Sequence, residues 1–426
     1  MRVLVIGSGA REHALCWALS RSSRVTKLYC APGNGGTGAV AENVALDPKD
    51  SVACATWVER EQIDLTIVGP EDPLAAGIAD IFVARGLPIF GPSAAAARIE
   101  SSKVWAKELL LRADVPTAPA DVYDDYEQAY RAIQRRSAEG GTYPVVIKAD
   151  GLAQGKGVVV AKTEAQALQA LTDFMRDRTL GDAGARTLIE ECLTGTELSL
   201  FALSDGLRVV ALAPACDYKR VNDNDEGGNT GGMGAYSPPK FATPEVLAEI
   251  ERTILRPTVA AMAAAGAPFI GLLYAGLMMT PTGPQVIEFN CRFGDPETQV
   301  VLPRLTSDLA ELCAAVAAGN LDTVAPPTWS DEAACGVALV SGGYPGKYEK
   351  GKLITRLDTL DDNILAFHAG TRRESDGRLV TNGGRVVTLV ARGASVAAAR
   401  ERVYANVERV KFEGAHWRTD IGAREL

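Results

Sequence analysis

Short apolar runs that end in glycine-containing turns recur through residues 1–92. They predict strands at 2–6, 27–30, 65–68 and 88–90, with segments between them that are suited to helices and loops. Short apolar strands separated by helices are typical of a parallel sheet, whose functional groups gather at the carboxyl ends of the strands. The beginning of the chain therefore predicts an α/β domain with its chemistry in the turns after the strands.

The periodicity becomes mixed after residue 100. A helix is expected from an N-cap at Ser101 or Ser102 to a point before Pro116. Residues from about 121 to 192 predict a compact α+β insert, with strands at 145–148, 157–161 and 187–191 and a helix capped by Thr163. Strands near 198–213, a polar loop at 217–237, a helix from Thr243 to Gly266 and a hairpin of strands 271–279 and 285–290 are expected to follow.

The last part of the chain predicts further strands. Pro326 and Pro327 mark a linker, and residues 381–384 (Thr-Asn-Gly-Gly) are a hairpin signal. The predicted fold class is α/β, in three domains. These are an N-terminal parallel-sheet α/β domain at 1–100, a central α+β region at 101–325 and a small C-terminal β-rich domain at 326–426.

Composition and charge narrow the class of protein. The 426 residues are 47% hydrophobic and 23% charged, as in an ordinary soluble globular protein. The formal net charge of −9 argues against nucleic-acid binding, which needs a dense positive face. Eight Cys and three His are scattered without metal-binding spacing, which indicates reduced thiols in a cytoplasmic protein.

The sequence predicts no contact with a membrane. The chain begins directly with the apolar run 3–6, without the layout of a signal peptide. Residues 257–280 carry no charge, but Gly266 and Pro268 divide them into an Ala-rich helix and a strand. We therefore expect no membrane span.

The first glycine-rich turn, Gly7-Ser8-Gly9, follows a strand and opens a helix, which is half of a dinucleotide-binding fingerprint. Glu12 occupies the place of the third glycine, and the second strand ends without the acidic residue that holds a ribose hydroxyl. NAD binding is therefore disfavoured, although free amides at a helix N-terminus suit an anionic group. For Gly9, a tight structural turn and a site for a substrate phosphate both stay open.

The second glycine-rich loop, at 148–157, differs from a P-loop because no Ser or Thr follows Lys156. It joins two strands, so it is expected to cover a ligand as a flap. Backbone amides and the charges of Lys148 and Lys156 suit the phosphates of ATP. We therefore predict phosphate binding by Lys148 and by the flap residues Gly155, Lys156 and Gly157.

The third loop, at 217–234, combines dense charge with many glycines. Such a composition is ordinary for a solvated loop. A stretch of this length without regular structure inside a compact domain is uncommon, however, and tends to be functional.

The strand after the predicted hairpin turn has the residues of a metal site. Strict alternation at 286–292 places Glu288, Asn290 and Arg292 on one face, with Ile287 on the apolar face. A carboxylate and an amide oxygen beside phosphates suit Mg²⁺, which binds few protein oxygens and completes its shell with water and nucleotide. A polar sheet face exposed to water is the alternative.

Two segments, NTGGMGAYSP at 229–238 and EFNCRFGDPETQ at 288–299, resemble signatures of the phosphoribosylamine–glycine ligases, an ATP-grasp family. Shorter matches at 5–13, 67–71, 342–346 and 381–386 extend the resemblance over essentially the whole chain. It implies an ATP-grasp region at 101–325 whose mobile lid spans about 121–192. It also implies ATP as cofactor with Mg²⁺ or Mn²⁺, and glycine and 5-phosphoribosylamine as substrates. A monomer is favoured.

The resemblance also implies roles for particular residues. ATP phosphates would be held by Lys107, Lys148 and the flap, adenine by Glu190, Glu191 and Leu193, and the ribose hydroxyls by Glu197. The metal would be bound by Glu288 and Asn290, and the catalytic cations would be Arg292 and Lys219. The substrates would be contacted by Gly9, Glu71, Arg220, Gly232 and Asp295.

Some residues depart from the family pattern. The strand at 272–279 lacks the second acidic metal ligand of many ATP-grasp enzymes, which leaves the number of metal ions open. Tyr218, Asn222 and Gly228 also replace the usual residues of the third loop. The alternatives are another ATP-grasp ligase or carboxylase, a silent nucleotide-binding module and a dinucleotide oxidoreductase. The favoured chemistry is transfer of the γ-phosphoryl group to glycine, giving glycyl phosphate, under a lid that excludes water.

Overall fold

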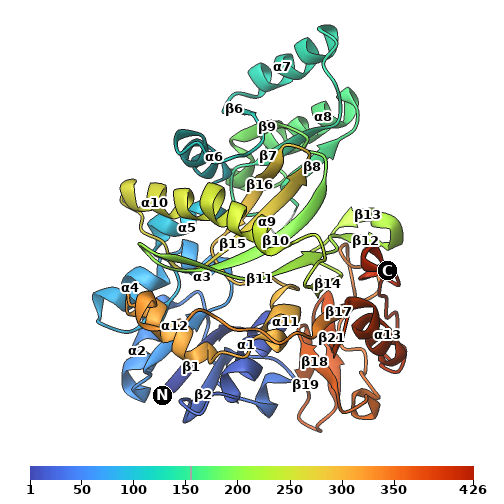
Figure 1. Cartoon of the computed structure of the whole chain (residues 1–426). Helices are drawn as coiled ribbons and strands as arrows, with labels where there is room; N and C mark the ends of the chain where they lie inside the picture. The colour runs from blue at the N-terminus through green and yellow to red at the C-terminus, as the bar shows by residue number, and fades with distance from the viewer. Residues whose placement is uncertain (154–155) are drawn as a thin grey trace.

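The computed structural model describes residues 1–153 and 156–426, so Gln154 and the predicted flap residue Gly155 lie outside it. The N-terminal part, blue in Figure 1, contains a parallel sheet in the order β3-β2-β1-β4-β5. Its strands are β1 (Arg2–Gly7), β2 (Lys27–Pro32), β3 (Glu42–Asn43), β4 (Leu65–Val68) and β5 (Ile89–Phe90). Its helices are α1 (Ala10–Ser20), α2 (Ser51–Glu61), α3 (Glu71–Ala75), α4 (Ile78–Ala84) and α5 (Ala94–Ser101). The predicted parallel α/β sheet is confirmed.

A smaller antiparallel sheet, in the order β6-β9-β7-β8, projects from the top of the molecule in Figure 1. It consists of β6 (Ala120–Tyr123), β7 (Val145–Ala149), β8 (Val158–Ala161) and β9 (Thr187–Glu191), with α7 (Tyr126–Ala138) and α8 (Glu164–Leu171) against it. The side chain of Thr163 accepts the amide of Gln166 and caps α8, as predicted. This unit, called the lid below, has its own small core around Ile133, Ile147 and Phe174. It is joined to the rest through α6 (Lys103–Arg112).

The largest sheet has eight strands in the order β16-β15-β10-β11-β14-β17-β21-β18. Its strands are β10 (Thr196–Asp205), β11 (Val209–Asp217), β14 (Gly234–Ser237), β15 (Ile270–Thr280), β16 (Gly283–Asn290), β17 (Ala333–Val340), β18 (Ile364–His368) and β21 (Arg385–Gly393). Pairing of β14 with β17 carries the sheet across the boundary predicted at 325/326. The three-domain division remains a prediction, and the C-terminal strands extend the central sheet.

Helices flank this sheet and connect its strands. They are α9 (Pro244–Ile250), α10 (Arg256–Ala264), α11 (Thr298–Val301), α12 (Leu309–Ala317) and α13 (Val396–Val407). A π-helical turn, Glu251–Leu255, joins α9 to α10, so the predicted helix between Thr243 and Gly266 is continuous in course. A second π turn is Thr172–Arg176, and short 3-10 turns are Thr37–Ala39, Gly181–Gly184, Asp223–Asp225, Leu302–Arg304, Leu321–Thr323, Leu357–Thr359 and Ala423–Glu425.

Three local predictions are wrong. The loop at 217–237 contains a hairpin of β12 (Arg220–Asn222) and β13 (Glu226–Asn229), and then β14. The segment 381–384 does not turn a hairpin, because β20 (Leu379–Thr381) pairs with β19 (Thr371–Arg373) and β21 lies in the large sheet. Its glycines instead allow close backbone approach, since a Cβ on Gly383 would lie 2.8 Å from the Cα of Gly370. The alternation in β16 is also interrupted, because a bulge leaves Ile287 only half-buried.

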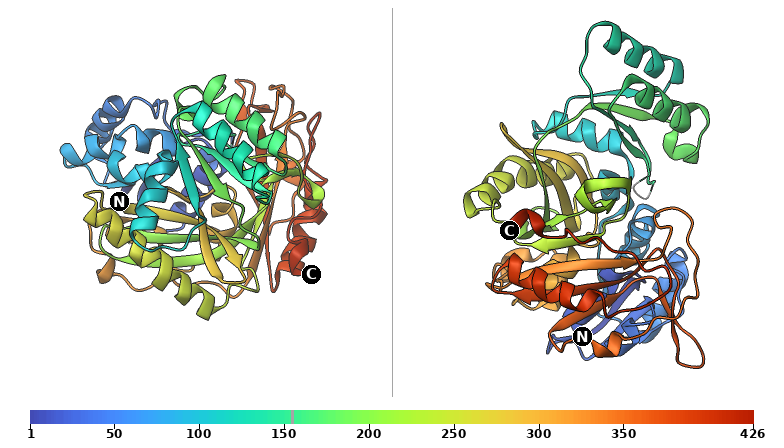
Figure 2. Two further views of the ribbon diagram at one scale, coloured as in Figure 1. Left: turned by 90° about the horizontal axis from the view of Figure 1, so that it is seen from above. Right: turned by 90° about the vertical axis from the view of Figure 1, so that its right-hand side faces the viewer.

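The N-terminal sheet and the large sheet lie close together below the lid in the right-hand view of Figure 2. His13 on α1 packs against Phe367 and His368 of β18, which joins the N-terminal domain to the C-terminal strands. All eight cysteines are free, and none of the described helices is both long and apolar enough to cross a membrane.

Candidate active site

Glu288 lies on β16 among cations from three segments, of which Lys148 is buried and Lys103 and Lys219 are half-buried. Gly276 on β15 faces it, and a Cβ there would lie 3.2 Å from Glu288 Cγ, so the glycine leaves room for the carboxylate. Burial alone would raise the pKa of Glu288, but the charges of Lys219, Lys148 and Lys103 hold it below its usual value. The carboxylate is therefore ionised at neutral pH, as a metal ligand must be.

The predicted metal site has only two protein ligands, Glu288 and Asn290. Asn290 is two residues beyond Glu288 on the same strand, and its Oδ1 accepts a hydrogen bond from Arg292 Nη2 at 3.4 Å. Among residues 1–153 and 156–426, no group of three or more His, Cys, Asp or Glu side chains forms a metal cluster. One carboxylate and one amide oxygen suit a cation that takes its remaining ligands from water and nucleotide.

Lys148 on β7 of the lid and Lys107 on α6 share a single carboxylate. Glu190 on β9 lies 2.7 Å from Lys148 Nζ and 3.2 Å from Lys107 Nζ, and all three side chains are 5% exposed. Burial lowers the pKa of Lys107, although Glu190 opposes the shift. Two ammonium groups on one carboxylate leave a surplus positive charge, which suits a phosphate oxygen.

A bulge in β16 provides another partner for Lys148. Gly276 pairs with Glu288 and Leu277 with Val286, so Ile287 is the extra residue. Its carbonyl accepts a hydrogen bond from Lys148 Nζ at 2.9 Å. The bulge therefore fixes the lysine of the lid against the strand that carries Glu288.

The described part of the flap begins at a well-anchored base. Asp150 accepts hydrogen bonds from Ser102 Oγ at 2.9 Å and from the amide of Val104 at 2.8 Å, and it forms an ion pair with Arg186. Lys103 Nζ donates to the carbonyl of Gly151 at 3.1 Å. Lys156 is exposed, and Gly157 is buried with its carbonyl bonded to the amide of Ala149.

The predicted adenine and ribose residues lie on the segment that leaves the lid. Glu191 forms a bidentate ion pair with Arg136 at 2.7 and 3.0 Å, so its side chain is directed toward α7. Leu193 follows in the connection to β10. Glu197 accepts a hydrogen bond from Lys219 Nζ at 2.7 Å. The structure thus brings Glu197, a predicted nucleotide residue, together with Lys219, a predicted catalytic residue.

Acidic groups surround Lys219. Burial acts against its charge, but Asp217 and Glu197 raise its pKa well above the usual value. Burial raises the pKa of Asp217 to about 7, and Lys219 opposes the shift. Asp217 was not among the predicted site residues, and its local signal was its place two residues before Lys219 in the charged loop.

Arg292 is held between two carboxylates of the N-terminal half. Its guanidinium lies 3.0 Å from Glu71 and 2.8 Å from Glu100. Although burial acts to raise the pKa of Glu71, Arg292 and Arg11 lower it to about 2. Glu100 was not predicted, and its burial raises its pKa.

Three of the predicted substrate residues meet where the N-terminal turn approaches the C-terminal strands. A Cβ on Gly9 would lie 3.4 Å from Asp295 Oδ2, and one on Gly232 would lie 2.3 Å from Pro296 Cδ. Arg385 of β21, which was not predicted, pairs with Asp295 at 3.2 Å and donates to the carbonyl of Gly231 at 2.6 Å. The amide of Gly9 is already bonded to Glu12 at 2.5 Å, which accounts for a tight turn without a ligand.

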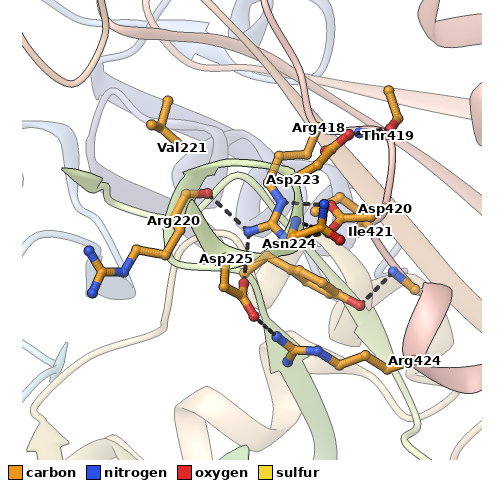
Figure 3. Close-up of polar contacts among 12 residues, drawn as sticks. Arg220, Val221, Asp223, Asn224, Asp225, Arg418, Thr419, Asp420, Ile421 and Arg424 are labelled. Atoms are coloured by element: carbon orange, nitrogen blue, oxygen red, sulfur yellow. Dashed lines mark hydrogen bonds and ion pairs between the residues drawn. The ribbon is translucent and has the colours of Figure 1, made fainter. Parts of the chain in front are cut away.

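Arg220 does not join this group. Its guanidinium donates to the carbonyl of Gly227 within the β12–β13 hairpin, and it extends away from the neighbouring polar cluster (Figure 3). Its assignment to the substrate remains a prediction.

A lid sheet above a large antiparallel sheet, with buried lysines and a carboxylate–amide pair where they meet, defines an ATP-grasp enzyme. Family models describe the chain in three consecutive pieces. They are the N domain, the ATP-grasp (A) domain and the C domain of phosphoribosylglycinamide synthetase, which match residues 1–100, 101–298 and 334–424. The chain belongs to the phosphoribosylglycinamide synthetase family.

Individual relatives agree with this assignment. The phosphoribosylamine–glycine ligase of Chlorobaculum tepidum is 47% identical over 431 residues, and the alignment covers 100% of both chains. The crystal structure of the phosphoribosylamine–glycine ligase from Thermotoga maritima is similar with a TM-score of 0.83 and 32% identity, covering 99% of this chain and 100% of that one. The biotin carboxylase domain of the Hydrogenobacter thermophilus 2-oxoglutarate carboxylase, at 16% identity and a TM-score of 0.72 over 97% and 91% of the two chains, shares the fold. The chain is thus an ATP-dependent ligase of the kind that joins glycine to phosphoribosylamine in purine biosynthesis.

Proposed function

We propose that this site joins glycine to 5-phosphoribosylamine through glycyl phosphate, giving glycinamide ribonucleotide, ADP and phosphate. The observation that carries the proposal is the group of cations, Lys103, Lys148 and Lys219, around the ionised Glu288. Such a group neutralises the charge of a phosphoryl group in transfer and supplies no nucleophile of its own.

The nucleotide would lie between the lid and the large sheet. We infer that its phosphates are contacted by Lys107, Lys148 and Lys156. Adenine would contact the backbone at Glu190, Glu191 and Leu193. Glu197 would release its hydrogen bond from Lys219 and accept hydrogen bonds from the ribose hydroxyls instead. The surplus charge at Glu190 supports the phosphate position. The related biotin carboxylase domain is described as a complex with MgADP, and this supports a nucleotide with a divalent cation at the same place in the fold.

Glu288 and Asn290 fit Mg²⁺ or Mn²⁺, because one is ionised by its surroundings and the other adds a neutral oxygen. When bound with the nucleotide, the cation would offset the charge of the phosphate oxygens. The side chains and backbone of the protein would position the nucleotide and the substrates.

The reaction proceeds in two steps. A carboxylate oxygen of glycine attacks the γ-phosphorus of ATP and the bond to the bridging oxygen breaks, which gives glycyl phosphate and ADP. The amine of phosphoribosylamine then attacks the acyl carbon, phosphate leaves with the former glycine oxygen, and the amine loses a proton. Arg292 and Lys219 stabilise the charge that develops on the oxygens.

The substrates would approach from the side of the N-terminal domain. Gly9, Gly232 and Asp295 lie together there, and Glu71 is connected to the site through Arg292. We propose that these residues contact phosphoribosylamine and glycine, with Arg220 as a further cation for the substrate phosphate. Lys219→Ala or Arg220→Ala should then affect the KM for the ribosylamine or kcat/KM; a change in ATP affinity alone would place them at the nucleotide.

The function is tested by ADP release with freshly prepared phosphoribosylamine. We expect release only when ATP, a divalent cation, glycine and phosphoribosylamine are all present, and glycinamide ribonucleotide in an amount equal to ADP. Activity with a different acid would identify another ATP-grasp ligase, and nucleotide binding without turnover would identify a silent binding module.

A further inference from the structure

The backbone on both sides of Lys219 is fixed from two directions. The carbonyl of Tyr218 accepts the amide of Met233 at 2.8 Å, and that of Lys219 accepts the amide of Thr230, also at 2.8 Å. These contacts come from the glycine-rich segment that follows the β12–β13 hairpin. The third carbonyl in the row, that of Arg220, accepts a hydrogen bond at 3.1 Å from Arg418, which is 198 residues away in sequence. The C-terminal segment thus completes the hydrogen bonding of the peptide that carries Lys219.

Arg418 is the centre of this contact (Figure 3). Its side chain is 0% exposed, yet each of its nitrogens has an acceptor. Nε and Nη2 form a fork on Asp420 at 2.7 and 2.6 Å, and Nη1 donates to Asp225 Oδ1 at 3.0 Å as well as to the carbonyl of Arg220. A buried guanidinium is costly unless it is fully hydrogen-bonded, so its geometry is strongly fixed by these partners.

Tyr218 forms the second part of the contact. Its ring lies between two guanidinium groups, 4.7 Å from Arg418 and 4.6 Å from Arg424. Its hydroxyl accepts the amide of Gly422 at 3.0 Å, and Arg424 also pairs with Asp225. Tyr218, the residue immediately before Lys219, is 2% exposed. The contacts with the C-terminal segment therefore hold its side chain in place.

The tip of the hairpin is joined to the same segment. Asp420 Oδ2 accepts the amide of Asn224 at 2.9 Å, and Asp223 Oδ1 accepts the amide of Thr419 at 2.8 Å. The hairpin and residues 418–424 therefore form one hydrogen-bonded unit, which we name the C-terminal clamp. It consists of Tyr218, Asp223, Asn224, Asp225, Arg418, Thr419, Asp420, Gly422 and Arg424.

We propose that Arg418 is a positioning residue for the ligase reaction, which acts through Lys219 by holding the 218–220 backbone in the C-terminal clamp. The inference rests on the catalytic role proposed for Lys219. The ammonium group of Lys219 is carried on a four-carbon stem of limited length, so the position of the backbone decides which groups it can reach. A displacement of about 1 Å at a catalytic group can lower a rate by roughly 100-fold. The clamp keeps Lys219 Nζ within 2.7 Å of Glu197 and next to Glu288.

The proposal is tested by variants of Arg418 assayed well below their unfolding temperature. Arg418→Gln removes the charge and the fork, and it should lower kcat by about 10-fold to 100-fold with the KM for ATP unchanged. Arg418→Lys keeps the charge without the fork and should recover part of the loss. Arg409→Ala is the control, because Arg409 is a partly exposed arginine paired with Asp361 elsewhere in the C-terminal part. It should leave kcat unchanged.

The decisive comparison is made in the background of Lys219→Ala. If Arg418 acts through Lys219, Arg418→Gln should change the residual kcat of that background by less than about twofold. Loss factors that multiply in the double variant, or a normal kcat in Arg418→Gln, would overturn the proposal. If Arg418→Gln does not fold, Arg418→Lys and Asp225→Asn are used in the same comparison.

Hydrogen exchange separates this proposal from the proposed function. Exchange of the amides at 219–234 should be faster in Arg418→Gln and unchanged in Arg409→Ala, whatever the substrate of the enzyme. If Arg418→Gln shows faster exchange but the wild-type protein shows no glycine-dependent turnover, the clamp stands and the proposed function alone is contradicted. Unchanged exchange in Arg418→Gln would contradict the clamp.

Discussion

At the scale of single residues, Glu288 is the carboxylate around which the cations of the candidate site gather. It is half-buried, and its pKa is held down by Lys219, Lys148 and Lys103, which come from three different segments. Alternation along one strand predicted that Glu288, Asn290 and Arg292 lie on one face, and Arg292 does donate a hydrogen bond to Asn290. Their partners could not be predicted in this way, because Glu100 and Asp217 become neighbours only through the fold, and a bulge directs the carbonyl of Ile287 toward Lys148.

Glu288→Ala should lower kcat at least about 100-fold, since the chain offers no other carboxylate beside Asn290 on this strand. Binding of Mn²⁺ in the presence of ATP, measured by electron paramagnetic resonance, should weaken in parallel. Glu401→Ala, which changes an exposed carboxylate on α13, is the matched control. Wild-type turnover of Glu288→Ala at limiting Mg²⁺ would remove Glu288 from the metal site.

At the scale of elements, the lid is nearly independent of the body. Its hydrophobic core is separate, and hydrogen bonds such as those of Lys148 with Ile287 and of Asp150 with Val104 join it to the body. The sequence predicted β7, β8, β9 and the helix capped by Thr163 from local signals, but it did not predict β6 or α7. The hairpin at 220–229 had no such signal, since its partners are close to the C-terminus.

Because these links surround the proposed phosphate site, nucleotide binding should hold the lid against the body. We expect amides at 156–161 and in β7 to exchange more slowly with ATP and Mg²⁺ than without them. Amides of β17 and β21, which are distant from the lid in the large sheet, should be unaffected. Equal protection of 156–161 with and without nucleotide would contradict closure of the lid.

At the scale of the whole molecule, the N-terminal domain and the C-terminal strands meet at two buried histidines. The amide of His368 donates to His13 Nδ1 at 2.9 Å, and the rings are 5.5 Å apart. Burial, aided by His368, lowers the pKa of His13 to about 3, and burial, aided by Arg373, lowers that of His368 to about 4. Both rings are therefore neutral in the folded protein at pH 5.5. The sequence marked Pro326 and Pro327 as a linker but gave no sign of this contact or of the sheet that crosses the boundary.

The free energy of unfolding should fall as the pH is lowered through 6.5. The unfolded chain then takes up protons on both rings and the folded protein does not, and the effect grows until the folded pKa values near 4 and 3 are reached. At pH 5.5 the loss is about 1.4 kcal/mol per ring relative to pH 7.5. Urea unfolding should show a smaller loss by about that amount in His13→Asn. An identical pH dependence in the variant and the wild type would contradict this account.

We propose above all that the enzyme activates the carboxylate of glycine by phosphoryl transfer. Glycine labelled with ¹⁸O in its carboxylate gives the most direct test, because one labelled oxygen must leave with the phosphate when the amide forms. Mass spectrometry after one turnover with ATP and phosphoribosylamine should therefore find inorganic phosphate carrying one ¹⁸O atom. Unlabelled phosphate, formed together with glycinamide ribonucleotide, would contradict the glycyl phosphate intermediate.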